Sequence, residues 1–222
     1  MDNYNQDDIE KFRLAVEQLE VARELIGSNS HVKARMAMIL VDNLGDVLAT
    51  RLCESIFKED SFFAIARIPR INPSEIQEAR RDFNTKISIL ERVRIISGAD
   101  ATILRISHQY RNAAFHRDVH NASIIKILAR ACFKTVCNLF IKKYDIGVSY
   151  GGMDPIRWLL PYAKNTTRLN FREDSKIIAS KLLKGTQISI PKFRKDLLED
   201  IAQRLRVINK IQDEVGCRSP RP

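Results

Sequence analysis

Apolar residues recur at intervals of three and four over long stretches of the chain, and this spacing predicts α-helices. Glycine and proline, which interrupt helices, are few, with 8 and 7 among 222 residues. The pattern therefore predicts an all-α fold, a bundle of long helices joined by short turns. We expect helices over about residues 6–26, 31–57, 74–96, 100–116 and 122–143.

The expected second helix carries a wide apolar stripe, which is typical of a helix central to a bundle. The stretch "GSNS" before it ends the first helix and offers side-chain oxygens that can cap the second. Ser74 is the expected cap of the third helix. Strand signals are weak, and "TQISIP" is the best candidate for one. The expected stripe consists of Ile39, Leu40, Leu44, Val47, Leu48, Leu52 and Ile56.

One clear interruption, the Gly-rich "YDIGVSYGGMDP", divides the chain. We expect residues 1–145 to form the bundle and residues 146–222 to form a helical extension, packed on the bundle or separate from it. Within the extension, a short helical piece is expected at "IRWLLPYA", followed by helices near residues 174–183 and 192–215.

Composition narrows the class of protein. With 45% hydrophobic and 29% charged residues the chain has the balance of an ordinary folded domain. No apolar run approaches the roughly 18 residues that span a bilayer, so we expect no membrane partner. The stretch "MDNYNQDDIEKF" is acidic and polar, unlike a secretory signal, which favours a cytoplasmic protein. The four cysteines form no C-x-x-C pair, so we expect buried free thiols at Cys53, Cys132 and Cys137, no metal site and no cofactor.

The net charge of +10 and the isoelectric point near 9.6 favour polyanionic partners, with nucleic acid first and an anionic membrane second. Seven cations in the second half of the chain are candidates for a broader basic surface, although each can equally be a solvated charge. They are Lys142, Lys143, Arg168, Arg172, Lys192, Arg194 and Lys195.

The stretch "HQYRNAAFHRD" places several side chains that can bind phosphate or transfer protons on the fourth expected helix. His108, Asn112 and His116 are each four residues apart and share a helix face, with Arg111 on the neighbouring stripe. An imidazole can move a proton at neutral pH, and a guanidinium can hold two phosphate oxygens. Together these groups suit metal-free cleavage of RNA, because the ribose 2′-OH supplies the nucleophile.

These residues resemble the R-x4–6-H motif of the HEPN superfamily, in which the arginine is usually followed by a polar residue, here Asn112. The resemblance covers about residues 6–143. It implies a metal-independent endoribonuclease, of the kind found in toxins or antiphage defence, whose cleft forms between two protomers. By the same resemblance Arg111 binds phosphate, Asn112 is its polar partner and His116 is catalytic. The expected partners are an RNA substrate, a second copy of the chain and a possible antitoxin or regulatory protein.

Other readings of the same residues stay open. Arg111 can form an interhelical salt bridge with Asp42 or Asp46, which can also hold a motif arginine in place for catalysis. The whole chain can be a non-catalytic helical module that binds RNA or protein, or a toxin subunit under a separate antitoxin. Four flanking residues are candidates for RNA contact, although His108 can instead bond inside the bundle and His120 can cap a turn. They are His108, Arg117, His120 and Arg105.

Overall fold

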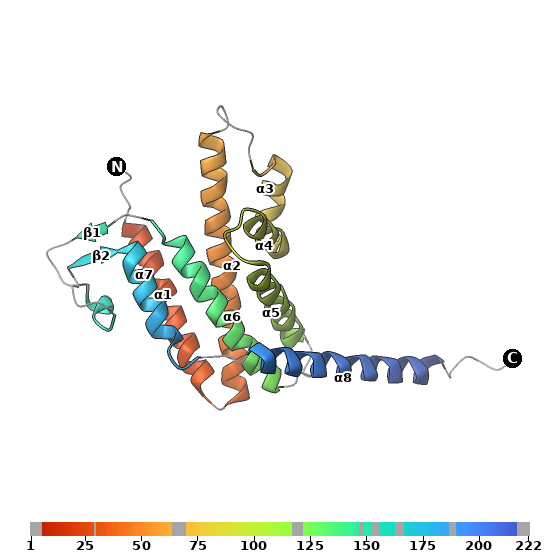
Figure 1. The fold of residues 1–222 in the computed structure, drawn as a ribbon. Coiled ribbons are helices and arrows are strands. Elements are labelled where there is room, and N and C mark those ends of the chain that lie inside the picture. The colour runs from red at the N-terminus through yellow and green to blue at the C-terminus, as the bar shows by residue number, and fades with distance from the viewer. Residues whose placement is uncertain are drawn as a thin grey trace.

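The computed structural model confirms the all-α fold: eight α-helices account for nearly all of the regular structure in the described residues (Figure 1). The structure describes residues 6–28, 30–63, 70–116, 122–146, 149–151, 156–162, 167–186 and 190–216. In chain order the elements are α1 (Gln6–Gly27), α2 (His31–Phe62), α3 (Pro73–Ala79), α4 (Phe83–Arg92), α5 (Gly98–His116), α6 (Ala122–Lys143), β1 (Ser149–Gly151), a 3-10 turn (Arg157–Leu159), β2 (Arg168–Asn170), α7 (Phe171–Leu183) and α8 (Ile190–Gly216).

Helix α2 is the central element, with α1, α4, α5 and α6 packed around it. The predicted stripe is mostly correct, since Leu44, Leu48, Leu52 and Ile56 are buried. Val47 is the exception. Its side chain lies on the solvent face, with 43% of the residue exposed, because the helix turns it away from the packed side.

The most extensive contact between two helices lies between α2 and α6. A Cβ placed on Gly45 would lie 3.1 Å from Cγ2 of Val136, so a larger residue there would push Val136 away by a few tenths of an ångström. One turn further along α6, the ring of Phe12 meets the rings of Phe140 and Tyr144 with centroids 5.0 and 4.6 Å apart. Such aromatic contacts stabilise the core beyond their buried area.

The predicted helix over residues 74–96 is wrong, because two helices, α3 and α4, occupy this segment. The break comes at Asp82, whose carboxylate accepts hydrogen bonds from the backbone N–H of Thr85 at 2.6 Å and from its hydroxyl at 2.9 Å. An aspartate in this role begins a new helix instead of continuing the old one. The cap of α3 is also not Ser74 but Asn72, which forms a capping box with Glu75.

The start of α2 is as predicted. Ser30 has an extended backbone and its hydroxyl accepts from the N–H of Lys33 at 3.4 Å. The helix continues past the expected end at Phe57 as far as Phe62. The end of α2 is joined to the chain after it by Asp60, which accepts hydrogen bonds from Arg70 and Ile71.

The region after α6 holds more than helices. Strands β1 and β2 pair antiparallel in a two-stranded ribbon, with Tyr150 opposite Leu169. Helix α7 then packs on α6 and α1. The best strand candidate, "TQISIP", is only partly described: Thr186 follows α7, residues 187–189 lie outside the described part, and Ile190 begins α8.

Helix α8 touches the bundle with its first half and then extends away from it (Figure 1). Leu198, Ile201 and Leu205 on this helix are 56%, 43% and 54% exposed, respectively. No helix in the described part of the chain is both long and apolar enough to cross a membrane.

Candidate functional site

The buried carboxylate of Asp42 lies at the centre of the site. It accepts a hydrogen bond from Nε of Arg111 at 2.7 Å, and its two oxygens lie 3.0 and 3.2 Å from Nδ1 of His108. His108 and Arg111 are three residues apart on α5, so both reach the same point on α2. The Asp42 side chain is 1% exposed, against 19% for His108 and 22% for Arg111. The carboxylate thus lies inside the bundle, and the imidazole and the guanidinium lie at the edge of the bundle.

The hydrogen bonds to Asp42 fix the orientation of the His108 imidazole and of the Arg111 guanidinium. An ionised carboxylate can only accept, so the hydrogen bond places a proton on Nδ1 of His108 and leaves Nε2 of that ring for another partner. Arg111 uses Nε, and among the described residues Nη1 and Nη2 have no hydrogen-bond partner. These two nitrogens can donate two parallel hydrogen bonds to the oxygens of a phosphate group. The predicted interhelical salt bridge of Arg111 is confirmed, and it is made with Asp42.

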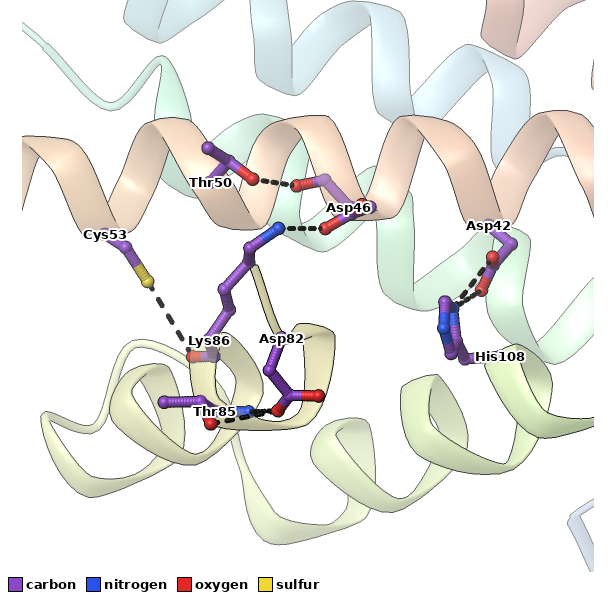
Figure 2. A network of polar contacts seen from close by, with 8 residues as sticks. All are labelled: Asp42, Asp46, Thr50, Cys53, Asp82, Thr85, Lys86 and His108. Atoms are coloured by element: carbon purple, nitrogen blue, oxygen red, sulfur yellow. Dashed lines mark hydrogen bonds and ion pairs between the residues drawn. The ribbon is translucent and has the colours of Figure 1, made fainter. Parts of the chain in front are cut away.

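The His108 ring is held on its other side by Phe83. The two rings stack at a centroid distance of 4.2 Å and an interplanar angle of 14°. Phe83 is the first residue of α4, directly after the capping Asp82, so the break between α3 and α4 places this ring. Figure 2 shows His108 pointing from α5 toward Asp42 on α2.

A second ion pair lies one turn further along α2 (Figure 2). Nζ of Lys86 donates to Oδ1 of Asp46 at 2.6 Å, and the Lys86 side chain is only 7% exposed. Asp46 is therefore engaged by α4 and not by Arg111. Nearby Cys53 is buried and its Sγ lies 3.8 Å from the carbonyl oxygen of Lys86. Burial raises the pKa of the Cys53 thiol to about 12, which keeps it from acting as a nucleophile.

The other two cysteines predicted to be buried, Cys132 and Cys137, are buried free thiols, and their pKa values are likewise raised to about 12 by burial. Together with Cys53 they are part of the core, as the apolar spacing predicted.

The remaining motif residues are only partly described. Asn112 is exposed and lies next to Arg111 on α5. His116 is the last residue of α5, and its side chain lies outside the described part of the structure. Arg117 and His120 lie in the segment 117–121, which is also outside it. The structure thus brings Arg111 and His108 together and places Asn112 beside them. It leaves the positions of the His116, Arg117 and His120 side chains as predictions.

Arg105 is separate from the Asp42 cluster. Its Nη2 donates to Oγ of Ser88 at 3.0 Å and to a carboxylate oxygen of Glu91 at 3.1 Å, which ties α5 to the end of α4. With this side chain engaged by α4, its predicted role in RNA contact has no support from its neighbours in the structure.

Sequence reasoning missed one contact beside the motif. The hydroxyl of Tyr110 donates to Oδ2 of Asp200 at 2.7 Å, and Asp200 is 4% exposed. This hydrogen bond joins α8 to α5 at the residue before Arg111. A buried aspartate within the amphipathic pattern of α8 was the available signal, but its partner is 90 residues away in the chain.

The cations of the predicted basic surface do not share one environment in the structure. Arg172 pairs with Asp145 at 2.9 Å, and Arg168 donates to Oγ of Ser149 at 3.0 Å. Lys142 is exposed, whereas Lys143 faces a pocket between helices. Arg194 and Lys195 are exposed on α8, and the side chain of Lys192 lies outside the described part.

Comparisons with protein-family models, with curated proteins and with solved structures found no match. Within the described residues, no group of three or more His, Cys, Asp or Glu side chains is placed to hold a metal ion.

Proposed function

We propose that this protein is a metal-independent endoribonuclease of the HEPN type. The observation that carries the proposal is the way Asp42 holds Arg111. A buried carboxylate engages Nε and leaves Nη1 and Nη2 without a described partner on a side chain that is 22% exposed. A guanidinium oriented in this way before substrate arrives can stabilise the charge that develops on a phosphorus centre.

In the proposed reaction His116 takes the proton from a ribose 2′-OH, and that oxygen attacks the neighbouring phosphorus. The bond from phosphorus to the 5′-oxygen breaks, and a protonated imidazole returns a proton to this leaving oxygen. The products are a 2′,3′-cyclic phosphate and a 5′-hydroxyl end. Arg111 stabilises the pentacoordinate phosphate, and Asn112 lies next to it on the exposed side of α5.

The resemblance to HEPN proteins implies a cleft built by two protomers, and an exposed apolar stripe on α2 supports a second copy. Val32, Met36 and Val47 are 67%, 50% and 43% exposed. These three residues lie within about 60° of one another around α2, with the exposed Asn43 between them, and about 80–140° around the helix from Asp42. Contact along this stripe would bring the α2 helices of two protomers together.

The proposal is tested with purified protein on end-labelled single-stranded RNA in the presence of EDTA. Wild type is expected to cleave and to leave cyclic phosphate ends, and an all-2′-deoxy substrate of the same sequence should remain intact. His116→Ala and Arg111→Ala should lower the cleavage rate by at least about 100-fold. Arg23→Ala, which removes one exposed arginine from α1, serves as the matched control and should cleave as wild type does.

A second candidate is a non-catalytic helical module that binds RNA or protein. It is favoured by the same carboxylate, because Asp42 bonded to both His108 and Arg111 also makes a good interhelical clamp. Absence of cleavage by folded wild type, with RNA bound equally well by His116→Ala, would favour this candidate. The toxin or antiphage setting, and control by a separate antitoxin, are extensions of the nuclease proposal.

A further inference from the structure

A polar pocket lies on the opposite side of α2 from Asp42, between the start of α1, the second half of α2 and the end of α6. Its volume is about 170 Å³. Arg51 and Lys58 enter it from α2 and Lys143 enters it from α6. Arg51 and Lys58 follow Asp42 by 9 and 16 residues, which turns them roughly 160–180° away from it around the helix. The pocket is therefore not a continuation of the candidate nuclease site.

Three cations in this pocket have no carboxylate within ion-pair distance among the described residues. Nζ of Lys143 lies 3.4 Å from Oγ of Ser55, and Nη1 of Arg51 lies 3.5 Å from the hydroxyl of Tyr144, and both contacts are long. Lys58 has no described partner. Lys86, which is more deeply buried, is by contrast paired with Asp46.

Charges of both signs surround Lys143. Burial lowers the pKa of its ammonium, Asp8 and Glu54 act in the opposite direction, and Arg51 and Lys58 lower the pKa by repulsion. Asp8 and Glu54 line the pocket. Lys11 also lines it but is paired with Asp7, so three cations face the two carboxylates. Folding has thus gathered an excess of positive charge in a partly enclosed space. That arrangement is unfavourable unless an anion shares it.

We propose that this pocket binds a phosphate group. The guanidinium of Arg51 and two lysines suit its oxygens, and the hydroxyls of Tyr144 and Ser55 offer further donors. Tyr144 stays a donor throughout the physiological range, since burial raises its pKa to about 12. The pocket is smaller than the roughly 300 Å³ at which sites for drug-sized ligands begin, so it fits a phosphate group and not a whole nucleotide.

The phosphate group can belong to a free small anion or to RNA. The proposal does not depend on the nuclease activity, because it rests on other residues and on another face of α2. The two sources are separated by competition: RNA that uses the pocket should displace inorganic phosphate from it, whereas RNA bound elsewhere should not.

The test is calorimetric titration of the full chain with inorganic phosphate in a phosphate-free, low-salt buffer. Wild type should show saturable binding of one phosphate per chain. Lys143→Gln and Lys58→Gln should each weaken it about tenfold or more, as expected for losing one charge-assisted contact. Lys142→Gln removes the same charge from the exposed neighbour of Lys143 and should change the affinity by less than about twofold.

Since Lys58 is exposed, its substitution leaves the core intact and keeps the test valid if Lys143→Gln proves unstable. The melting temperature of wild type should also rise with phosphate, and that of Lys58→Gln should rise less. The proposal is wrong if wild type shows no saturable binding, or if Lys142→Gln weakens binding as much as the two pocket variants, because then only net charge matters.

Discussion

The carboxylate of Asp42 and the guanidinium of Arg111 meet at 2.7 Å although 69 residues separate them in the chain. This hydrogen bond joins α5 to α2, and its acceptor, the Asp42 side chain, is almost fully buried. A buried carboxylate is costly without partners, so Asp42 needs both Arg111 and His108. The same bond that stabilises the bundle therefore also orients the proposed phosphate-binding arginine.

Asp42→Asn should lower the free energy of unfolding by about 2–3 kcal/mol, because the neutral amide no longer pairs with the charge of Arg111 and has an NH2 donor in place of one accepting oxygen. Urea unfolding followed by circular dichroism measures this. Asp145→Asn breaks the exposed pair with Arg172 and should cost no more than about 0.5 kcal/mol. Equal losses in the two variants would show that burial of Asp42 does not matter.

Replacing Asp46 should destabilise the protein more than replacing its partner Lys86. Asp46→Ala leaves the buried Lys86 ammonium unpaired and should cost about 2 kcal/mol or more. Lys86→Met keeps an apolar stem of similar length, and Asp46, which is 38% exposed, can be hydrated instead, so this change should cost less than about 1 kcal/mol. The same unfolding experiment compares them, and a larger loss in Lys86→Met would contradict the asymmetry.

Gly45→Ala should destabilise the protein by about 1 kcal/mol. The new Cβ would lie 3.1 Å from Val136, and this overpacking outweighs the gain of about 1 kcal/mol in helix propensity. In a Val136→Ala background the contact is removed, so the same substitution should become stabilising. Thermal unfolding of the four variants in the cycle measures the change of sign.

Gly27→Ala is the control for that cycle, because a Cβ at Gly27 would have no atom within 4 Å. It should be neutral or slightly stabilising. If Gly45→Ala behaves in the same way as Gly27→Ala in the wild-type background, the close approach of α2 and α6 does not limit the side chain at position 45.

The Asp60–Arg70 contact predicts a loss of stability in acid. Burial by itself would raise the pKa of Asp60, but the hydrogen bonds and charge of Arg70, with the backbone N–H of Ile71, outweigh it and lower the pKa below its ordinary 3.8. A carboxyl group with a lowered folded-state pKa stabilises the fold above the unfolded value, and this contribution is lost as the pH falls through the folded value.

Asp60→Asn should therefore be less stable than wild type above about pH 4, and the difference should shrink as the pH is lowered. Urea unfolding at several values between pH 6 and pH 3 gives the two curves. A difference that stays constant over this range would show that the contact acts through packing and not through the charge of Asp60.

The pattern of apolar residues was enough to predict the helices that form the core. The starts of α1 and α2, the cap at Ser30 and the buried cysteines follow from local spacing and side-chain chemistry, which a single segment contains. Asp82 shows the limit of this reasoning. The apolar spacing on both sides of Asp82 predicts one continuous helix, but its capping hydrogen bond begins a new one. The spacing of apolar residues along the chain does not distinguish an exposed aspartate from an aspartate that caps a helix.

The sequence by itself determined that this protein is a helical bundle with a basic balance of charge and a motif that resembles the HEPN nucleases. The tertiary structure alone decided that Asp42 rather than Asp46 holds Arg111, that Phe83 supports His108, and that Lys143 faces Arg51 and Lys58 across a pocket. Helix periodicity is a local property of the backbone. The meeting of charges from distant helices depends on how those helices cross, and packing of the entire core sets that crossing.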